Sequence, residues 1–194
     1  MYTNNPYSAW TKGSNFPGGA PPPSVFGALP YSSSAAKAPM VTFTFSFNPS
    51  ILSCTVTGPH NKIYYRIATD KPTPGFTFVH DAQGNPVVVI EWQNHPIIEI
   101  RGIVPKQYAC QWLSLSSQRN ARHMQVASKQ YVWAPGDGVI CLFDTSSGTP
   151  ELLGKITNGQ TRVTLDLTTY AIQGGLTEAA VVSTILLLSG RNID

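Results

Sequence analysis

The chain has 194 residues, enough for one domain and a terminal tail, because domains centre near ~100–150 residues. Hydrophobic residues make up 42% of the sequence, which allows a sizeable core, whereas only 12% are charged, about half the usual ~25%. The net charge is only +3 and the charges are scattered, so we do not expect a nucleic-acid-binding protein, whose surface usually carries a strongly basic patch.

The first forty residues differ in composition from the rest. They are rich in Pro, Gly, Ser, Ala and Asn, with Pro21-Pro22-Pro23 near the middle. Such a segment buries too little apolar area to offset its conformational entropy, so the sequence predicts a disordered arm over residues 1–40 and a folded domain over residues 41–194. A few aromatic residues in the arm leave open a second interpretation, short docking elements: Tyr2, Tyr7, Trp10, Phe16, Phe26 and Tyr31.

From Val41 onward the sequence is typical of short strands separated by turns. Residues 41–47 alternate apolar and polar side chains, the pattern of a half-buried strand. A loop is expected over residues 71–75, and Asp81 to Asn85 is typical of a hairpin turn. The strands expected in this half are residues 41–47, 54–56, 63–67, 76–79, 87–92 and 96–101.

The second half continues in the same way. Pro135 to Gly138 predicts a turn, and Asn158-Gly159 is a strong hairpin signal because both central residues of that turn need a positive φ. The strands expected here are residues 112–115, 122–126, 130–133, 139–143, 152–156 and 162–167. About a dozen short strands with turns at roughly 8–12-residue spacing predict an all-β sandwich or barrel.

The last element is apolar on every side. Leu176 to Leu188 is dominated by Ala, Val, Ile and Leu, with Gly174-Gly175 before it and Gly190 after it. We predict a helix over about residues 174–189, and a helix that is apolar all round must be buried all round. At ~1.5 Å per residue it spans about 20 Å, too short for a bilayer but suited to the inside of a small barrel. A buried strand over residues 180–188 is the alternative.

No pattern in the sequence indicates catalysis. His60, His80, His95 and His123 lack metal-ligand spacing, and no nucleophile elbow or phosphate-binding loop occurs. We therefore expect neither an enzyme nor a bound cofactor or metal.

The three cysteines bear on the compartment. Cys54, Cys110 and Cys141 are odd in number and far apart, so we expect buried, reduced thiols and an intracellular, cytoplasmic protein. A secretory signal and a membrane-spanning run are both missing from the sequence, which leaves peripheral attachment as the only membrane association expected.

One cluster of basic residues is a candidate anion site. If strands 122–126 and 130–133 form a tight hairpin, its basic groups gather near one rim of the barrel, where they could hold the phosphate of a lipid head group. The alternative is an ordinary solvated edge whose charges deter strand addition. The candidate residues are Lys106, Arg119, Arg122, His123 and Lys129.

Several short motifs resemble a fungal family of unknown function found mainly in mushroom-forming basidiomycetes. They are Ile90-Glu91-Trp92, His95-Pro96, Glu99-Ile100-Arg101-Gly102, Tyr131-Val132-Trp133 and the run from Leu188 to Asp194. The resemblance covers about residues 41–194. It implies the architecture shared by tubby C-terminal-like, LURP-one-related and scramblase proteins, in which a β-barrel of about 12 antiparallel strands encloses a hydrophobic C-terminal helix.

The functional expectation follows from that architecture. Tubby-like domains bind phosphoinositides, so the resemblance implies a non-enzymatic binding module that takes an anionic phospholipid or a protein partner at the barrel rim. The chain lacks the Cys-rich and calcium-binding segments of scramblases, so scramblase activity is not expected. Two alternatives stay open: an interaction protein that acts through its arm, and a carrier of a small lipophilic ligand. The oligomeric state is left open.

Overall fold

The computed structural model describes residues 39–70, 75–159 and 161–194. The predicted arm therefore lies outside the described residues except for its last two, and so does most of the predicted loop at 71–75. The helical elements are η1 Pro59–Asn61, a 3-10 turn, and the α-helices α2 Ala109–Trp112, α3 Thr169–Gln173 and α4 Thr177–Leu188. The strands are β1 Met40–Ser50, β2 Ser53–Thr57, β3 Ile63–Thr69, β4 Phe76–Asp81, β5 Pro86–Glu91, β6 Ile97–Ile100, β7 Val104–Tyr108, β8 Leu113–Leu115, β9 Arg122–Val126, β10 Lys129–Gly136, β11 Val139–Asp144, β12 Glu151–Asn158 and β13 Arg162–Thr168.

In the described part of the chain, all thirteen strands belong to one antiparallel sheet of order β7-β6-β5-β4-β3-β2-β1-β13-β12-β11-β10-β9-β8. Strands that are consecutive in the chain pair with one another, except for β7 and β8. In addition, residues 40–46 of β1 pair with 162–168 of β13. That pairing places the first and last strands of the domain side by side. All other neighbouring strands of the sheet are consecutive in the chain. The prediction of a mainly β, antiparallel domain of about twelve strands is confirmed, with one strand more.

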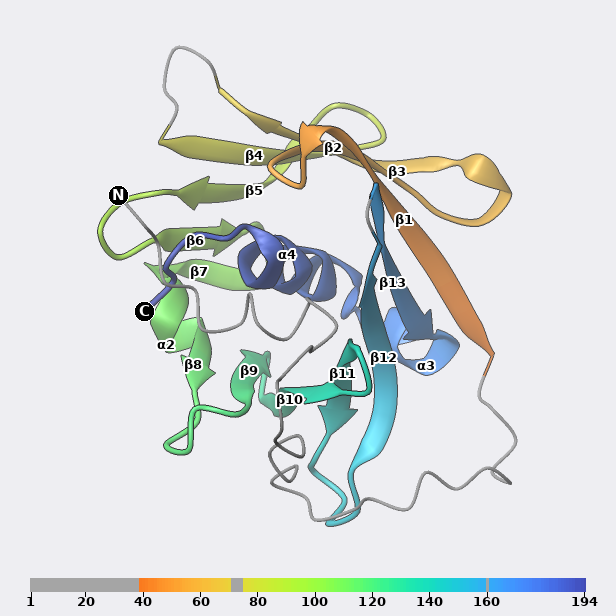
Figure 1. Cartoon of the computed structure of the whole chain (residues 1–194), viewed down its shortest axis with the longest axis vertical. Coiled ribbons are helices and arrows are strands. Elements are labelled where there is room, and N and C mark those ends of the chain that lie inside the picture. The colour runs from red at the N-terminus through yellow and green to blue at the C-terminus, as the bar shows by residue number, and fades with distance from the viewer. Residues whose placement is uncertain (1–38, 71–74, 160) are drawn as a thin grey trace, which may run out of the picture.

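The sheet has two edge strands, β7 and β8, and they are consecutive in the chain. No hydrogen-bonded ladder joins them among the described residues, so the sheet is not closed by strand pairing. The four residues of α2 connect them instead, and Figure 1 shows α2 between the two edges. A short helical turn thus occupies the place where a closed barrel would have its last strand pair.

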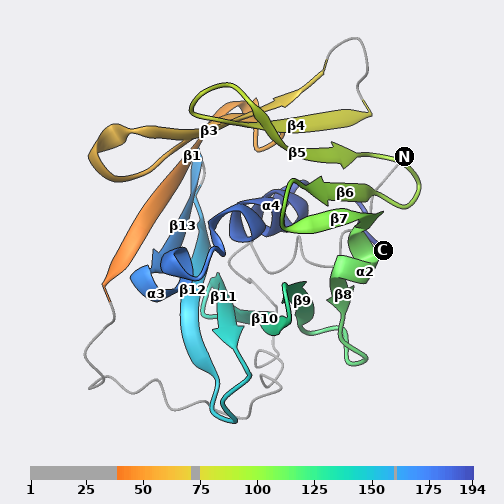
Figure 2. The same cartoon turned by 180° about the vertical axis from the view of Figure 1, so that it is seen from behind.

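The helix α4 lies on the concave side of this sheet (Figures 1 and 2). All nine residues from Ala179 to Leu187 are buried, including the polar Ser183 and Thr184. The Thr184 hydroxyl donates to the carbonyl of Ala180 at 2.8 Å, which satisfies it within the helix. The helical interpretation of this segment is confirmed, and the strand alternative is wrong.

Alternation along the strands supplies the rest of the core. In β1, Phe43 and Phe45 are buried, whereas Thr42 and Ser46 on the opposite face are exposed. Such period-two burial is expected where one face of a sheet packs on a core and the other meets solvent. The inward side chains and α4 form a single large apolar cluster.

Two regions differ from the predicted elements. Val104 to Tyr108 forms β7, which was not predicted because Pro105, Lys106 and Gln107 do not alternate as a strand does. An edge strand tolerates proline because the backbone on its outer side forms no hydrogen bonds to another strand. Trp112, predicted as the first residue of a strand, ends α2, where its indole donates to the carbonyl of Gln125 at 2.9 Å.

The cysteines are all free, as predicted. Cys54 is buried, and desolvation raises the pKa of its thiol to about 12, so the thiol is protonated at neutral pH. Cys110 and Cys141 are only half-buried, which differs from the expected burial of all three.

The burial of α4 generates a test of stability. Val182→Asp or Leu186→Asp places an unpaired carboxylate where the side chain is 0% exposed. We expect either variant to unfold the domain, because burying such a charge costs several kcal/mol against a total stability of ~5–15 kcal/mol. Circular dichroism and chemical denaturation measure the effect. Gln173→Asp, which puts the same charge on an exposed helical position, is the matched control and should leave the unfolding free energy within ~0.5 kcal/mol; equal stability of all three variants would contradict the burial of α4.

Candidate functional site

The five residues of the predicted anion site lie in different surroundings. Lys106 is on the edge strand β7, where its ammonium forms an ion pair with Glu91 of β5. The lysine side chain is 55% exposed, and the carboxylate is mostly covered at 15%. This pair joins two strands on the outside of the sheet, so the charge of Lys106 is balanced locally.

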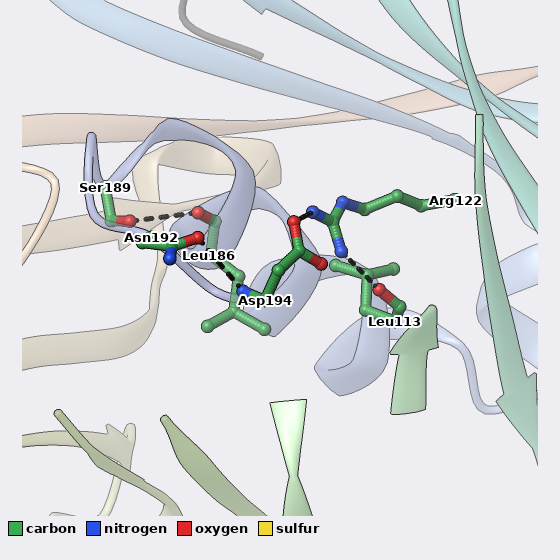
Figure 3. A network of polar contacts seen from close by, with 6 residues as sticks. All are labelled: Leu113, Arg122, Leu186, Ser189, Asn192 and Asp194. Atoms are coloured by element: carbon green, nitrogen blue, oxygen red, sulfur yellow. Dashed lines mark hydrogen bonds and ion pairs between the residues drawn. The ribbon is translucent and has the colours of Figure 1, made fainter. Parts of the chain in front are cut away.

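Arg122 does not lie on an open rim. Its side chain is 0% exposed, and its two terminal nitrogens donate to the Leu113 carbonyl at 2.6 Å and to the Asp194 carboxylate at 2.7 Å. Figure 3 shows the guanidinium held between these two acceptors, beside the end of α4. The predicted role of Arg122 as an exposed phosphate ligand does not fit this position, because β9 points the side chain into the interior, where Asp194 neutralises it.

The segment after α4 is tied down by more than this ion pair. Ile193 is buried at 1% exposure, and the guanidinium of Arg191 stacks 4.6 Å from the ring centre of Trp92. Figure 3 also shows the Ser189 hydroxyl donating to the carbonyl of Leu186 at 2.9 Å. Residues 189–194 therefore cover the C-terminal end of α4.

The remaining three basic residues are exposed. Arg119 sits in the loop between β8 and β9 with a φ of 57°, His123 is on the outer face of β9, and Lys129 begins β10. The predicted hairpin between β9 and β10 is formed. Hydrogen bonds from Ser146 lower the pKa of Asp144, and the nearby charge of Lys129 adds to this effect. Three of the five predicted residues thus lie near a carboxylate, and no purely cationic rim results.

A different feature has the shape of a binding site. A partly open cleft of about 490 Å³ lies where β1 and β3 meet the corner between α3 and α4. Apolar and aromatic side chains form most of its wall, and the first turn of α4 contributes its polar end. The lining residues are Val41, Phe43, Pro59, Tyr64, Tyr65, Ile172, Gly175, Thr177 and Glu178.

The aromatic wall of the cleft is held by close packing. Phe43 meets the ring of Tyr64 edge-on, with ring centres 5.2 Å apart, a favourable geometry for two aromatic quadrupoles. Gly58 lies against the same ring so closely that an added Cβ would come within 2.5 Å of it. The absence of a side chain at Gly58 therefore lets the turn before Pro59 pack directly against the Tyr64 ring.

The face of the Tyr64 ring also attracts a cation. The ammonium of Lys62 lies 5.9 Å from the ring centre, within the usual ~6 Å limit of a cation–π contact. The ring is half-buried, so water competes only partly for this contact.

Glu178 and Tyr65 form the polar end of the cleft. The Tyr65 hydroxyl donates to the Glu178 carboxylate at 2.9 Å, and burial together with the Glu178 charge raises the pKa of Tyr65. The tyrosine therefore stays a donor at neutral pH and orients the carboxylate. Glu178 lies in the first turn of α4, where the helix dipole stabilises a negative charge. No Lys or Arg of the described residues pairs with it.

Sequence reasoning missed this cleft because its residues are far apart in the chain. Val41 and Glu178 are separated by nearly the whole domain and meet only because β1 pairs with β13. The one signal available was Glu178 itself, a lone carboxylate in an otherwise apolar helix.

Two kinds of feature are absent from the described residues. No three His, Cys, Asp or Glu side chains among them gather closely enough to hold a metal ion. None of the helices they form has both the length and the apolar character needed to cross a membrane.

Comparison with known proteins does not assign the chain to a family. No family model matches the chain, and no curated protein matches it. Among solved structures it is similar to the X-ray structure of a protein from Arabidopsis thaliana, AT5G01750, with a TM-score of 0.40 and 8% identity, over 76% of this chain and 91% of that chain. Similarity at this level carries no information about a ligand or an activity.

The Arg122–Asp194 contact gives a second prediction. Asp194→Asn leaves a buried guanidinium without its carboxylate, and we expect it to lower the free energy of unfolding by ~1–3 kcal/mol. The double change Arg122→Met and Asp194→Asn removes the buried charge as well and should recover part of that loss. Lys106→Met breaks a pair whose lysine is 55% exposed and should cost less than ~1 kcal/mol. Urea denaturation measures all three; an Asp194→Asn variant as stable as the unchanged protein would contradict a stabilising role for the pair.

Proposed function

We propose that the domain is a non-enzymatic binding module whose ligand occupies the cleft between β1, β3 and the start of α4. The ligand class is a small molecule with an apolar or aromatic body and one cationic, hydrogen-bond-donating group. The observation that carries the proposal is an apolar cleft of about 490 Å³ that ends at the carboxylate of Glu178.

The size and lining of the cleft support the first half of this ligand description. Sites for small molecules are mostly apolar hollows of ~300–1,000 Å³ with a few well-placed polar groups. The rings of Phe43 and Tyr64 offer an aromatic body a flat surface, and Val41 and Ile172 add aliphatic contacts.

The charge at the end of the cleft supports the second half. One oxygen of Glu178 accepts the Tyr65 hydroxyl, which fixes the carboxylate and leaves its other oxygen for a ligand donor. The rings of Phe43 and Tyr64 line the same cleft and can pack against the apolar body of such a ligand. An anionic ligand would instead meet the Glu178 charge.

This proposal keeps the binding module expected from the sequence and favours its small-ligand alternative. An anionic lipid head at Lys106, Arg119, Arg122, His123 and Lys129 is less well supported, because Glu91, Asp194 and Asp144 lie beside three of these residues. An action through the arm concerns residues 1–38, which lie outside the described part.

We infer that the sheet and α2 act together as a barrel-type shell around α4, as in tubby C-terminal-like proteins, and that the chain is related to the fungal family its motifs resemble. What supports this is the short connection between the two edge strands and the complete burial of the helix.

Three matched probes test the proposed site: 2-phenylethylamine, 2-phenylethanol and 3-phenylpropionate, which share a ring and differ in charge. We expect the amine to shift the backbone amide NMR signals of Tyr65, Thr177 and Glu178 at the lowest concentration, and the carboxylate to bind most weakly. Glu178→Gln keeps an acceptor for the Tyr65 hydroxyl and should abolish the preference for the amine.

Glu99→Gln is the matched control, since it removes an exposed carboxylate of β6 and should leave the preference unchanged. The proposal fails if none of the probes shifts signals from the cleft, or if the amine keeps its advantage in the Glu178→Gln variant.

A further inference from the structure

A second apolar cluster lies on the outer face of the sheet. It consists of Ala121, Val132, Ala134 and Phe143, which we call the outer patch. Ala121 is the residue before β9, Val132 and Ala134 belong to β10, and Phe143 belongs to β11. In the register of these strands Val132 pairs with Phe143 and with His123, whereas their inward neighbours Tyr131, Trp133 and Leu142 belong to the main core. The outer patch therefore faces away from α4.

The side chains of the outer patch are covered far more than an outer face requires. Val132 is only 3% exposed and Ala134 only 8%, although both lie in the middle of β10 on the convex side. Ala68, an alanine on the outer face of β3, is exposed. A single sheet layer does not bury its own outer residues to this degree, so something packs over β9, β10 and β11 and not over β3.

The helices of the described residues do not account for the cover. Figures 1 and 2 show α4 inside the curve of the sheet, and α3 packs beside β12 and β13. The helix α2 contacts β9, but its Trp112 packs into the main core and not onto the outer patch. Ala121 lies next to the loop 116–120, whose Ser116 accepts its backbone N–H, so local structure explains its burial. Val132 and Ala134 lie in mid-strand, where they pack with Ala121 and Phe143, and their low exposure remains to be explained.

We propose that the outer patch is the docking surface for the N-terminal segment of the same chain, residues 1–38. The segment joins β1 at Met40, and β1 and β10 are four strand spacings apart in the sheet, about 19 Å at ~4.8 Å per spacing. Six or seven extended residues span that distance at ~3.3 Å each, so a 38-residue segment reaches the patch easily.

The composition of the segment suits this surface. The outer patch is flat, apolar and uncharged, and a sheet face offers no free backbone hydrogen bonds, so its occupant must bind through side chains. The segment contains Trp10, Phe16 and Phe26 spaced along the chain, with Pro21 to Pro23 between them. Proline lacks a backbone N–H and favours extended conformations, which allows such aromatic side chains to lie on a face at low entropic cost.

Photo-cross-linking in the full chain tests the proposal. The photoreactive residue p-benzoylphenylalanine replaces Gln125, an exposed residue on the outer face of β9 opposite Gln130 of β10. We expect illumination to join position 125 to residues 1–38, as identified by mass spectrometry of the digested protein. The same photoreactive residue at Ala68 is the matched control and should give no such product. Replacing Trp10, Phe16 and Phe26 by Ser should remove the cross-link.

An equal mixture of unlabelled and nitrogen-15-labelled protein identifies which chain supplies the segment. Docking within one chain gives only all-light and all-heavy cross-linked pairs, which is the expected result. Mixed pairs would show a second copy on the patch, and cross-links only to added proteins would show a foreign partner; either result overturns the proposal. It is equally overturned if residues 1–38 are absent from the products at position 125, provided that circular dichroism shows the fold retained.

Discussion

The structure depends on one constraint: α4 has no side that can face water. Its nine consecutive buried residues, from Ala179 to Leu187, must be surrounded, and no partner helix among the described residues is long enough to do this. A single antiparallel sheet of thirteen strands therefore curves around the helix. The pairing of β1 with β13 joins the first and last strands of the domain. Between the edge strands β7 and β8, the short helix α2 stands in place of a strand pairing.

The two ends of α4 differ because of how the chain enters and leaves it. At the C-terminal end the chain folds back, and Ile193, the Arg191–Trp92 stack and the Arg122–Asp194 pair cover the helix. At the N-terminal end the chain arrives from α3 through Gly174 and Gly175, and this corner leaves a cleft open beside Glu178. The carboxylate of Glu178, which the helix dipole stabilises, thus lies at the accessible N-terminal end of α4. For this reason we place the ligand site there.

The elements that were predictable from sequence are those with a local pattern. The alternation of residues 41–47 predicts a strand with one buried face, because successive side chains of a strand point to opposite faces. The apolar run that ends at Leu188 predicts a helix buried on all sides. β7 and α2 were missed because their form is set by contacts elsewhere, such as the bond from Trp112 to Gln125.

The candidate site was harder to predict for the same reason. The sequence groups Arg122 with Lys106 and Lys129, but β9 directs the Arg122 side chain inward and Lys106 pairs with Glu91. Lys129 lies near the carboxylate of Asp144. The cleft is lined by residues of β1, β3 and α4, which are far apart in the chain, so no local sequence pattern predicts that they lie together.

Hydrogen exchange of the backbone amides measures most directly whether the sheet encloses α4. If the sheet encloses α4, the amides of Val182 to Leu186 exchange only through global unfolding, with the same free energy as those of β13. Exchange of these helix amides through a smaller, local opening while β13 stays protected would contradict the account.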